Sequence, residues 1–141
     1  WYNAHPVPVK PGVKEILNHA KKWGIPCAVA SSSPLIQIEI LLNKAGLREY
    51  FSHLQSGESI KRGKPYPDIF LAVCKHFAVK PQDALVFEDS ENGLKAAEAG
   101  GIPAILVPDL AGIGESVAYK ALYICDSLIE AVHCLQEEEI L

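Results

Sequence analysis

An apolar run that ends in two carboxylates is the feature that most constrains the fold of this chain. Residues 84–87 lack polar and apolar alternation, which is typical of a strand buried on both faces in a parallel sheet. Glu88 and Asp89 follow at once, and the alanine-rich segment 92–100 predicts a helix. Open α/β sheets bind ligands at such strand-to-helix turns. We therefore expect Glu88 and Asp89 to lie at a functional edge of the sheet.

The acidic pair has two interpretations. Mg²⁺ prefers oxygen ligands and is often held by one or two carboxylates, so Glu88 and Asp89 suggest a cation site. Alternatively, the two acids cap the next helix, because negative charge is favourable at a helix N-terminus. Taken alone, the pair favours the helix cap.

The rest of the chain alternates between helical and strand-like patterns. Apolar residues at 13, 16, 17, 20 and 23 share one helical face, and Pro34 begins a helix that Gly46 ends. The other expected elements are strands at 25–30, 51–55, 102–107 and 122–125, and helices at 69–77 and 128–135. This order predicts an α/β fold with a doubly wound, mostly parallel, Rossmann-like sheet.

Composition excludes several classes of partner. A chain of 141 residues, 49% of them hydrophobic, is the size of one domain with a core. The net charge of −4 argues against nucleic acid, and no apolar run approaches the roughly 20 residues that cross a bilayer. The four cysteines form no Cys-x-x-Cys pair, so we expect reduced thiols in a cytoplasmic protein.

In a parallel sheet, the turns after residues 30, 55 and 87 lie at the same edge. Ser31 and Ser33, then Lys64, then the acidic pair are therefore expected to converge. Hydroxyls and helix N–H groups bind phosphate oxygens, lysine supplies positive charge and carboxylates hold Mg²⁺. Taken singly, Ser33 is also an ordinary helix cap before Pro34, and Lys64 an ordinary solvated loop lysine.

Three motifs in this order resemble the haloacid dehalogenase superfamily, in its phosphatase and β-phosphoglucomutase-like branch. They are a strand ending at Ser31, the segment Gly-Lys-Pro-Tyr-Pro-Asp-Ile-Phe at 63–70, and Val-Phe-Glu-Asp-Ser-Glu-Asn-Gly at 86–93. The match runs from about Pro11 to about Asp109. The resemblance implies Mg²⁺-dependent phosphoryl transfer, commonly hydrolysis of a small phosphorylated metabolite such as a sugar phosphate through an aspartyl-phosphate, and less often a mutase reaction.

The resemblance also implies roles for individual residues. The Ser31 hydroxyl binds the transferring phosphoryl group, and Lys64 neutralises the nucleophile and the phosphate. Asp89 is the direct Mg²⁺ ligand, and Glu88 binds the metal or its water. Three serines are expected to line these sites, Ser32 and Ser33 near phosphate and substrate and Ser90 near the metal.

One family motif is missing. The family's first strand carries Asp-x-Asp, whose first aspartate attacks phosphorus, whereas no two of the aspartates here (68, 83, 89, 109 and 126) are separated by one residue. That strand lies in the family between the strands ending at Ser31 and at Asp89, and a cap follows it.

We therefore expect a piece of a longer protein, an expectation that the absence of Met also favours. Residues 1–10 would be a linker from a missing cap, and 11–141 the C-terminal part of the core. An N-terminal segment or a second copy would complete the sheet.

Other functions remain as alternatives. A catalytically inactive remnant, or a self-associating module that binds phosphate or metal, explains the missing motif but not the remaining site residues. A two-component receiver domain has its paired acids before its lysine, whereas here Lys64 precedes Glu88 and Asp89. A dinucleotide-binding domain lacks support because no Gly-x-Gly-x-x-Gly follows a strand.

Overall fold

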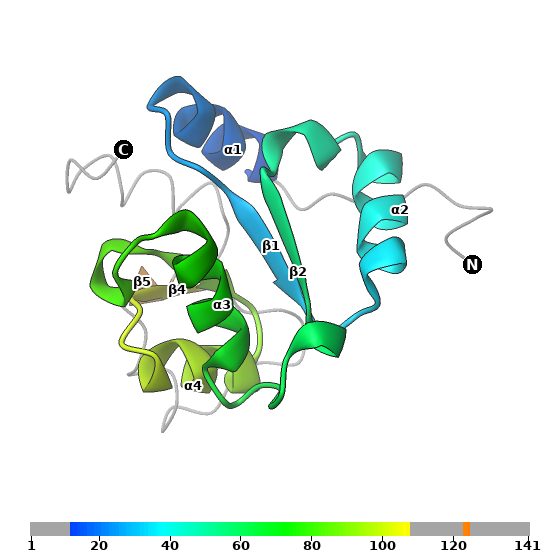
Figure 1. Ribbon diagram of the computed structural model, residues 1–141. Helices are drawn as coiled ribbons and strands as arrows, with labels where there is room; N and C mark the ends of the chain where they lie inside the picture. The colour runs from blue at the N-terminus through cyan, green and yellow to red at the C-terminus, as the bar shows by residue number, and fades with distance from the viewer. Residues whose placement is uncertain (1–11, 108–122, 125–141) are drawn as a thin grey trace.

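The computed structural model describes residues 12–107 and 123–124, where strands alternate with helices (Figure 1). The strands are β1 (Ala28–Ser31), β2 (His53–Ser56), β3 (Val86–Glu88), β4 (Ala104–Leu106) and β5 (Tyr123–Ile124). The α-helices are α1 (Val13–Lys22), α2 (Leu35–Ala45), α3 (Asp68–Phe77) and α4 (Glu91–Ala99), and 3₁₀ turns cover Arg48–Tyr50, Gly57–Ser59 and Pro81–Asp83. The predicted linker at 1–10 and the predicted helix at 128–135 lie outside the described residues.

Most predicted boundaries shift by one to three residues in the structure, and two of the shifts have a clear physical reason or bear on the site. The strand expected at 25–30 begins only at Ala28 and includes Ser31, because Pro26 has no N–H to give to a sheet and Ile25 is exposed. The helix expected from Pro34 begins at Leu35, with Pro34 as the N-cap and no side-chain cap hydrogen bond. The interpretation of Ser33 as the helix cap is therefore wrong.

All described strand pairs are parallel, which confirms the predicted α/β class. β1 pairs with β2 from Ala28 opposite His53 to Ser31 opposite Ser56, and β3 pairs with β4, which pairs with β5. Among the described residues, however, the strands form two sheets, in the orders β1-β2 and β3-β4-β5. The break falls between β1 and β3, the place at which the resemblance expects a central strand.

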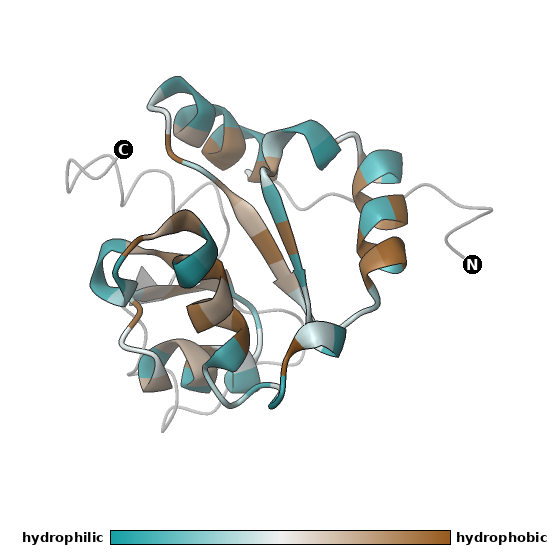
Figure 2. Cartoon of the chain, in the orientation of Figure 1, coloured by the Kyte–Doolittle hydropathy of each residue, from teal (hydrophilic) through white to brown (hydrophobic). Residues whose placement is uncertain are grey.

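Helix α3 joins the two sheets through one core. Its buried residues Ile69, Phe70 and Cys74 belong to a cluster with residues of α4 and β4. Ala30 of β1 and Val86 of β3 pack against that cluster, so both sheets contact the same apolar centre. Figure 2 shows the apolar colouring along β1 and α3. The core thus holds the two sheets together although no described backbone pairing links them.

The two described cysteines agree with the expectation of reduced thiols. Cys74 is buried and Cys27 partly buried, and both are free. Burial raises the pKa of each thiol, which makes both poor nucleophiles at neutral pH. Cys125 and Cys134 lie outside the described residues. No helix within the described ranges is long and apolar enough to cross a membrane.

Shortening Leu94 tests this core. Leu94 is 0% exposed at the centre of the cluster, and Leu→Ala at such sites costs about 2–5 kcal/mol of stability because a cavity remains. We expect Leu94→Ala to lower the free energy of unfolding in urea by that amount. Leu71→Ala, on the exposed side of α3, is the control and should cost under about 1 kcal/mol. Equal losses would contradict the proposed core.

Candidate active site

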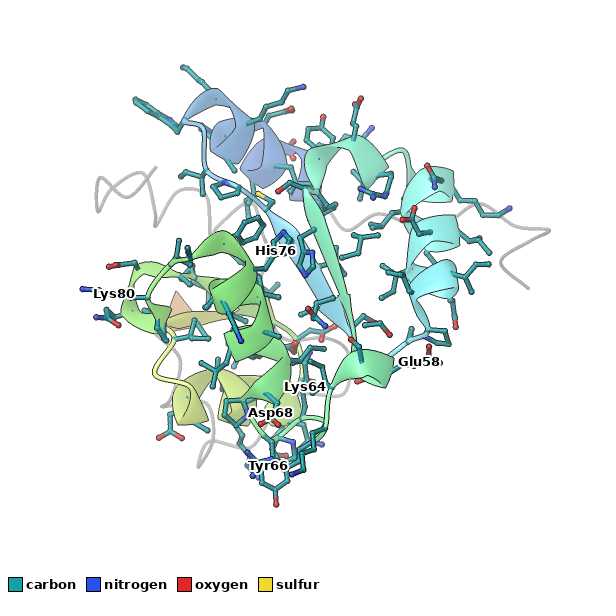
Figure 3. The ribbon with its side chains drawn as sticks, viewed as in Figure 1. Glu58, Lys64, Tyr66, Asp68, His76 and Lys80 are labelled. Atoms are coloured by element: carbon teal, nitrogen blue, oxygen red, sulfur yellow. The ribbon has the colours of Figure 1, made fainter. Side chains whose placement is uncertain are left out.

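The ends of β1, β2 and β3 bring the predicted site residues to one region. Ser31 is the last residue of β1 and lies in register with Ser56, the last residue of β2. Glu88 is the last residue of β3. Lys64 lies in the loop between β2 and α3, close to the start of α3 (Figure 3). Parallel pairing aligns the ends of β1 and β2, and the packing of α3 against both sheets brings the end of β3 to the same region.

Lys64 and Glu88 form an ion pair. Lys64 Nζ lies 2.8 Å from Glu88 Oε1, and the two side chains are 15% and 10% exposed. Lys64 Nζ also lies 4.9 Å from the centroid of the Phe70 ring, in a cation–π contact. Two charges so shielded from water are favourable only when they are paired. The interpretation of Lys64 as a solvated loop lysine is therefore wrong.

Ser90 holds the other carboxylate oxygen of Glu88. Its hydroxyl donates to Glu88 Oε2 at 2.9 Å and accepts from the Gly93 N–H at 3.1 Å. Ser90 is thus the N-cap of α4, so the idea that Glu88 and Asp89 cap this helix is wrong. The first turn of α4 and the acidic side chain of β3 are linked through one hydroxyl.

A polar pocket of about 460 Å³ opens beside the ion pair. It is lined by Ser32, Lys64, Glu88, Asp89, Ser90, Glu91 and Asn92. Of the three serines after β1, only Ser32 is in this lining. The Ser31 hydroxyl accepts from the Ser33 N–H at 3.2 Å, within the turn. The pocket therefore combines one cation, several carboxylates and hydroxyl groups, a set that suits a phosphate together with a metal ion.

The carboxylates of Glu88 and Asp89 are the candidate metal ligands. Within the part of the chain that the structure describes, no three His, Cys, Asp or Glu side chains are grouped to hold a metal. The donor set is thus two carboxylates, all oxygen. It fits Mg²⁺, which commonly binds one or two carboxylates and keeps several waters, and does not fit zinc.

Residues 31–33 form a serine turn at the end of β1, and Ser56 and Gly57 hold it in place. The sequence did not point to these two residues. Ser56 is a buried polar residue at 6% exposure, and its hydroxyl donates to the Ser33 carbonyl at 2.7 Å and accepts from the Glu58 N–H at 3.1 Å. A Cβ on Gly57 would lie 2.9 Å from the Ser32 Cα. A Ser-Gly pair at the end of a short strand was the sequence feature that could have pointed to them. Such pairs are common in turns, so the feature does not identify a binding site.

Gly93 is constrained by Glu88. A Cβ at this position would overlap Glu88 Cδ, so the carboxylate occupies the space that any other residue would fill. Gly93 is in the first turn of α4 and is buried. The glycine of the third motif therefore leaves room for the carboxylate of the same motif.

Comparison with known proteins gives consistent matches. The model of a hydrolase family, the haloacid dehalogenase-like hydrolases, matches residues 2–101. A phosphorylated carbohydrates phosphatase of Thermotoga maritima is 39% identical over 95 residues, covering 67% of this chain and 44% of that protein. The chain spans less than half the length of the curated relatives it matches.

Solved structures share the fold. CbbY from Rhodobacter sphaeroides in complex with phosphate superposes with a TM-score of 0.79 at 34% identity, covering 86% of this chain and 55% of that one. A putative β-phosphoglucomutase from Thermotoga maritima has a TM-score of 0.81 at 32% identity, covering 90% and 59%. The similarity thus includes the described helices and strands.

Exchanging Gly93 for alanine tests its contact with Glu88. At a solvent-exposed helix position, Gly→Ala raises the free energy of unfolding by about 1 kcal/mol. Here the added methyl group would displace the Glu88 carboxylate from Lys64 and Ser90. We expect Gly93→Ala alone to destabilise by about 1–2 kcal/mol, since hydrogen bonds to a charged group are lost. In a Glu88→Ala background the obstacle is gone, and Gly93→Ala should stabilise. The same sign in both backgrounds, measured by urea unfolding, would refute the contact.

Proposed function

The chain belongs to the haloacid dehalogenase-like hydrolase family, and we propose that it is part of a phosphatase that hydrolyses a small phosphorylated metabolite, such as a sugar phosphate, with Mg²⁺. The observation that carries this proposal is the Lys64–Glu88 ion pair at the edge of a pocket that Ser32 and Asp89 also line. A phosphorylated carbohydrates phosphatase is among the relatives, which supports the substrate class.

In the proposed reaction each site residue acts on phosphate or charge. An aspartate carboxylate oxygen bonds to phosphorus while the ester bond breaks, and the alcohol leaves with a proton from the second aspartate of the Asp-x-Asp motif. Water then attacks the aspartyl-phosphate, gives a proton back to that second aspartate and releases inorganic phosphate. Lys64 offsets the negative charge of the nucleophile and the phosphoryl oxygens. The serine turn at 31–33 donates hydrogen bonds to those oxygens. Mg²⁺, when bound, supplies further positive charge, and Asp89 and Glu88 would hold it.

The nucleophile in this proposal comes from a strand outside the 141 residues. The break between β1 and β3 supports it, because no described backbone pairing links these two strands. A groove of about 160 Å³ between them is lined by Ala28 and Ala30 of β1, by α3 and by β3. A strand in this groove would pair with both edges, and its carboxyl end would lie near Glu88 and Lys64. Residues 11–141 would then be the C-terminal part of the core.

Removing the charge of Lys64 or Asp89 tests the site. In the full-length protein we expect Lys64→Ala and Asp89→Asn each to lower kcat/KM for phosphate esters at least about 100-fold, because each removes charge stabilisation of the transition state. Lys95→Ala is the control, since Lys95 pairs with Glu91 on the surface of α4. Chelation of divalent metal should abolish turnover.

Near-wild-type rates in the Lys64 or Asp89 variant would contradict the proposal. Inorganic phosphate as the product supports a phosphatase, whereas an isomeric sugar phosphate without release of phosphate would indicate a mutase.

The strand proposal predicts the behaviour of the 141-residue chain by itself. Without the nucleophile strand it should hydrolyse no phosphate ester at a rate above the uncatalysed one. Light scattering and denaturing mass spectrometry of the protein expressed from its own gene, in place of the 141-residue chain, distinguish what fills the groove. A covalent species heavier than 15.3 kDa indicates an upstream segment. A 15.3 kDa chain that is dimeric in solution indicates a second copy, and a stable, active 15.3 kDa monomer would refute the proposal.

A further inference from the structure

The loop that carries Lys64 has few backbone N–H groups available to tie it to its neighbours. Between β2 and α3 it contains Gly63, Pro65 and Pro67, and the prolines have no N–H to donate. A turn closes around Lys64 through the Tyr66 N–H and the Gly63 carbonyl, at 3.1 Å. A long lysine side chain on such a loop has many rotamers, yet Lys64 Nζ lies 2.8 Å from Glu88 Oε1.

Arg62 connects the two sides of this loop. Its Nε and Nη2 donate to the two carboxylate oxygens of Asp68, at 3.2 and 3.0 Å. Its guanidinium carbon lies 4.4 Å from the centroid of the Tyr66 ring. Residues two before, two after and four after Lys64 are thus joined side chain to side chain, and Figure 3 shows Lys64, Tyr66 and Asp68 close together at the start of α3.

Asp68 attaches this cluster to helix α3. It is the first residue of α3, and the next two residues, Ile69 and Phe70, are buried in the core. The hydrogen bond to Asp68, and then its charge, raise the pKa of Arg62 above its usual value. The planar guanidinium can bind a carboxylate with two parallel hydrogen bonds and stack on a ring at the same time, which a lysine ammonium cannot do.

We propose that Arg62, Tyr66 and Asp68 form a clamp that positions Lys64 against Glu88, with Arg62 as the central positioning residue. As a contribution to catalysis the clamp rests on the proposed phosphatase function. Arg62 is not in the lining of the 460 Å³ pocket, so it acts through the loop and not by touching the substrate.

Because the clamp is exposed to solvent, its effect on the position of Lys64 can be measured apart from any effect on the stability of the fold. The Arg62 and Asp68 side chains are 53% and 21% exposed, and ion pairs so open to water contribute little to global stability. Removing Arg62 should therefore leave the fold intact and release Lys64 locally. A small displacement of a catalytic group can cost up to about 100-fold in rate, so a positioning effect is measurable where a stability effect is not.

The experiment compares Arg62→Ala with a matched control, Arg48→Ala. Arg48 also binds a carboxylate through two nitrogens, to Glu39 at 3.0 and 3.3 Å, and is far along the chain from Lys64. The first readout is the ¹⁵Nζ signal of Lys64 in the full-length protein, which the hydrogen bond to Glu88 makes observable. The second is kcat and KM for phosphate esters in the full-length protein.

We expect Arg62→Ala to broaden or abolish the Lys64 signal and to lower kcat about tenfold with less than a twofold change in KM and an unchanged circular dichroism spectrum. Arg62→Lys should restore little, Tyr66→Phe should behave as wild type because the ring remains, and Arg48→Ala should leave signal and kcat unchanged.

An unchanged Lys64 signal in Arg62→Ala, or an equal effect of Arg48→Ala, would overturn the clamp. A wild-type protein without phosphatase activity would refute the proposed function instead, and the Lys64 signal would still decide whether the clamp exists.

Discussion

The ion pair between Lys64 and Glu88 is the interaction on which the candidate site depends. Both side chains are mostly shielded from water, so either charge alone would be costly. The pair joins the loop after β2 to the end of β3, across 24 residues of sequence. Two residues at the start of α4 contact Glu88 in this pair. The Ser90 hydroxyl donates to the second carboxylate oxygen, and Gly93, which has no side chain, leaves space for the carboxylate. The first turn of α4 is therefore arranged around a charge.

Helix α3 makes this pair possible. It packs against residues of both sheets, and its first turn lies directly after the Lys64 loop. Phe70 is buried in the core, and its ring also makes a cation–π contact with the Lys64 ammonium. Since no described strand pairing links β1 and β3, the relative position of the serine turn and the acidic pair depends on the packing of α3. The groove beside α3 is also the place at which we propose that a further strand completes the sheet.

The serine turn shows how a polar group in the core shapes a binding edge. The buried hydroxyl of Ser56 ties the turn after β1 to the turn after β2, and the missing side chain of Gly57 lets the two backbones approach. As a result Ser32, the middle serine, faces the pocket, whereas the Ser31 hydroxyl bonds within its own turn. The Ser31 hydroxyl only accepts in this bond, so its O–H can still donate to a phosphate oxygen, as the family resemblance implies.

The sequence by itself determined the order of the elements and the identity of the charged groups. The apolar run before Glu88, the glycines after the helices and the Lys-Pro-Tyr-Pro-Asp and Glu-Asp-Ser segments are local patterns, and local patterns predict strands, helix ends and motifs. Only the tertiary structure decided that Lys64 pairs with Glu88, that Ser90 and not an acid caps α4, and that the strands within the described residues divide into two sheets. The ion pair and the division of the strands depend on contacts between residues distant in sequence, which no local pattern encodes, and side-chain packing selects them.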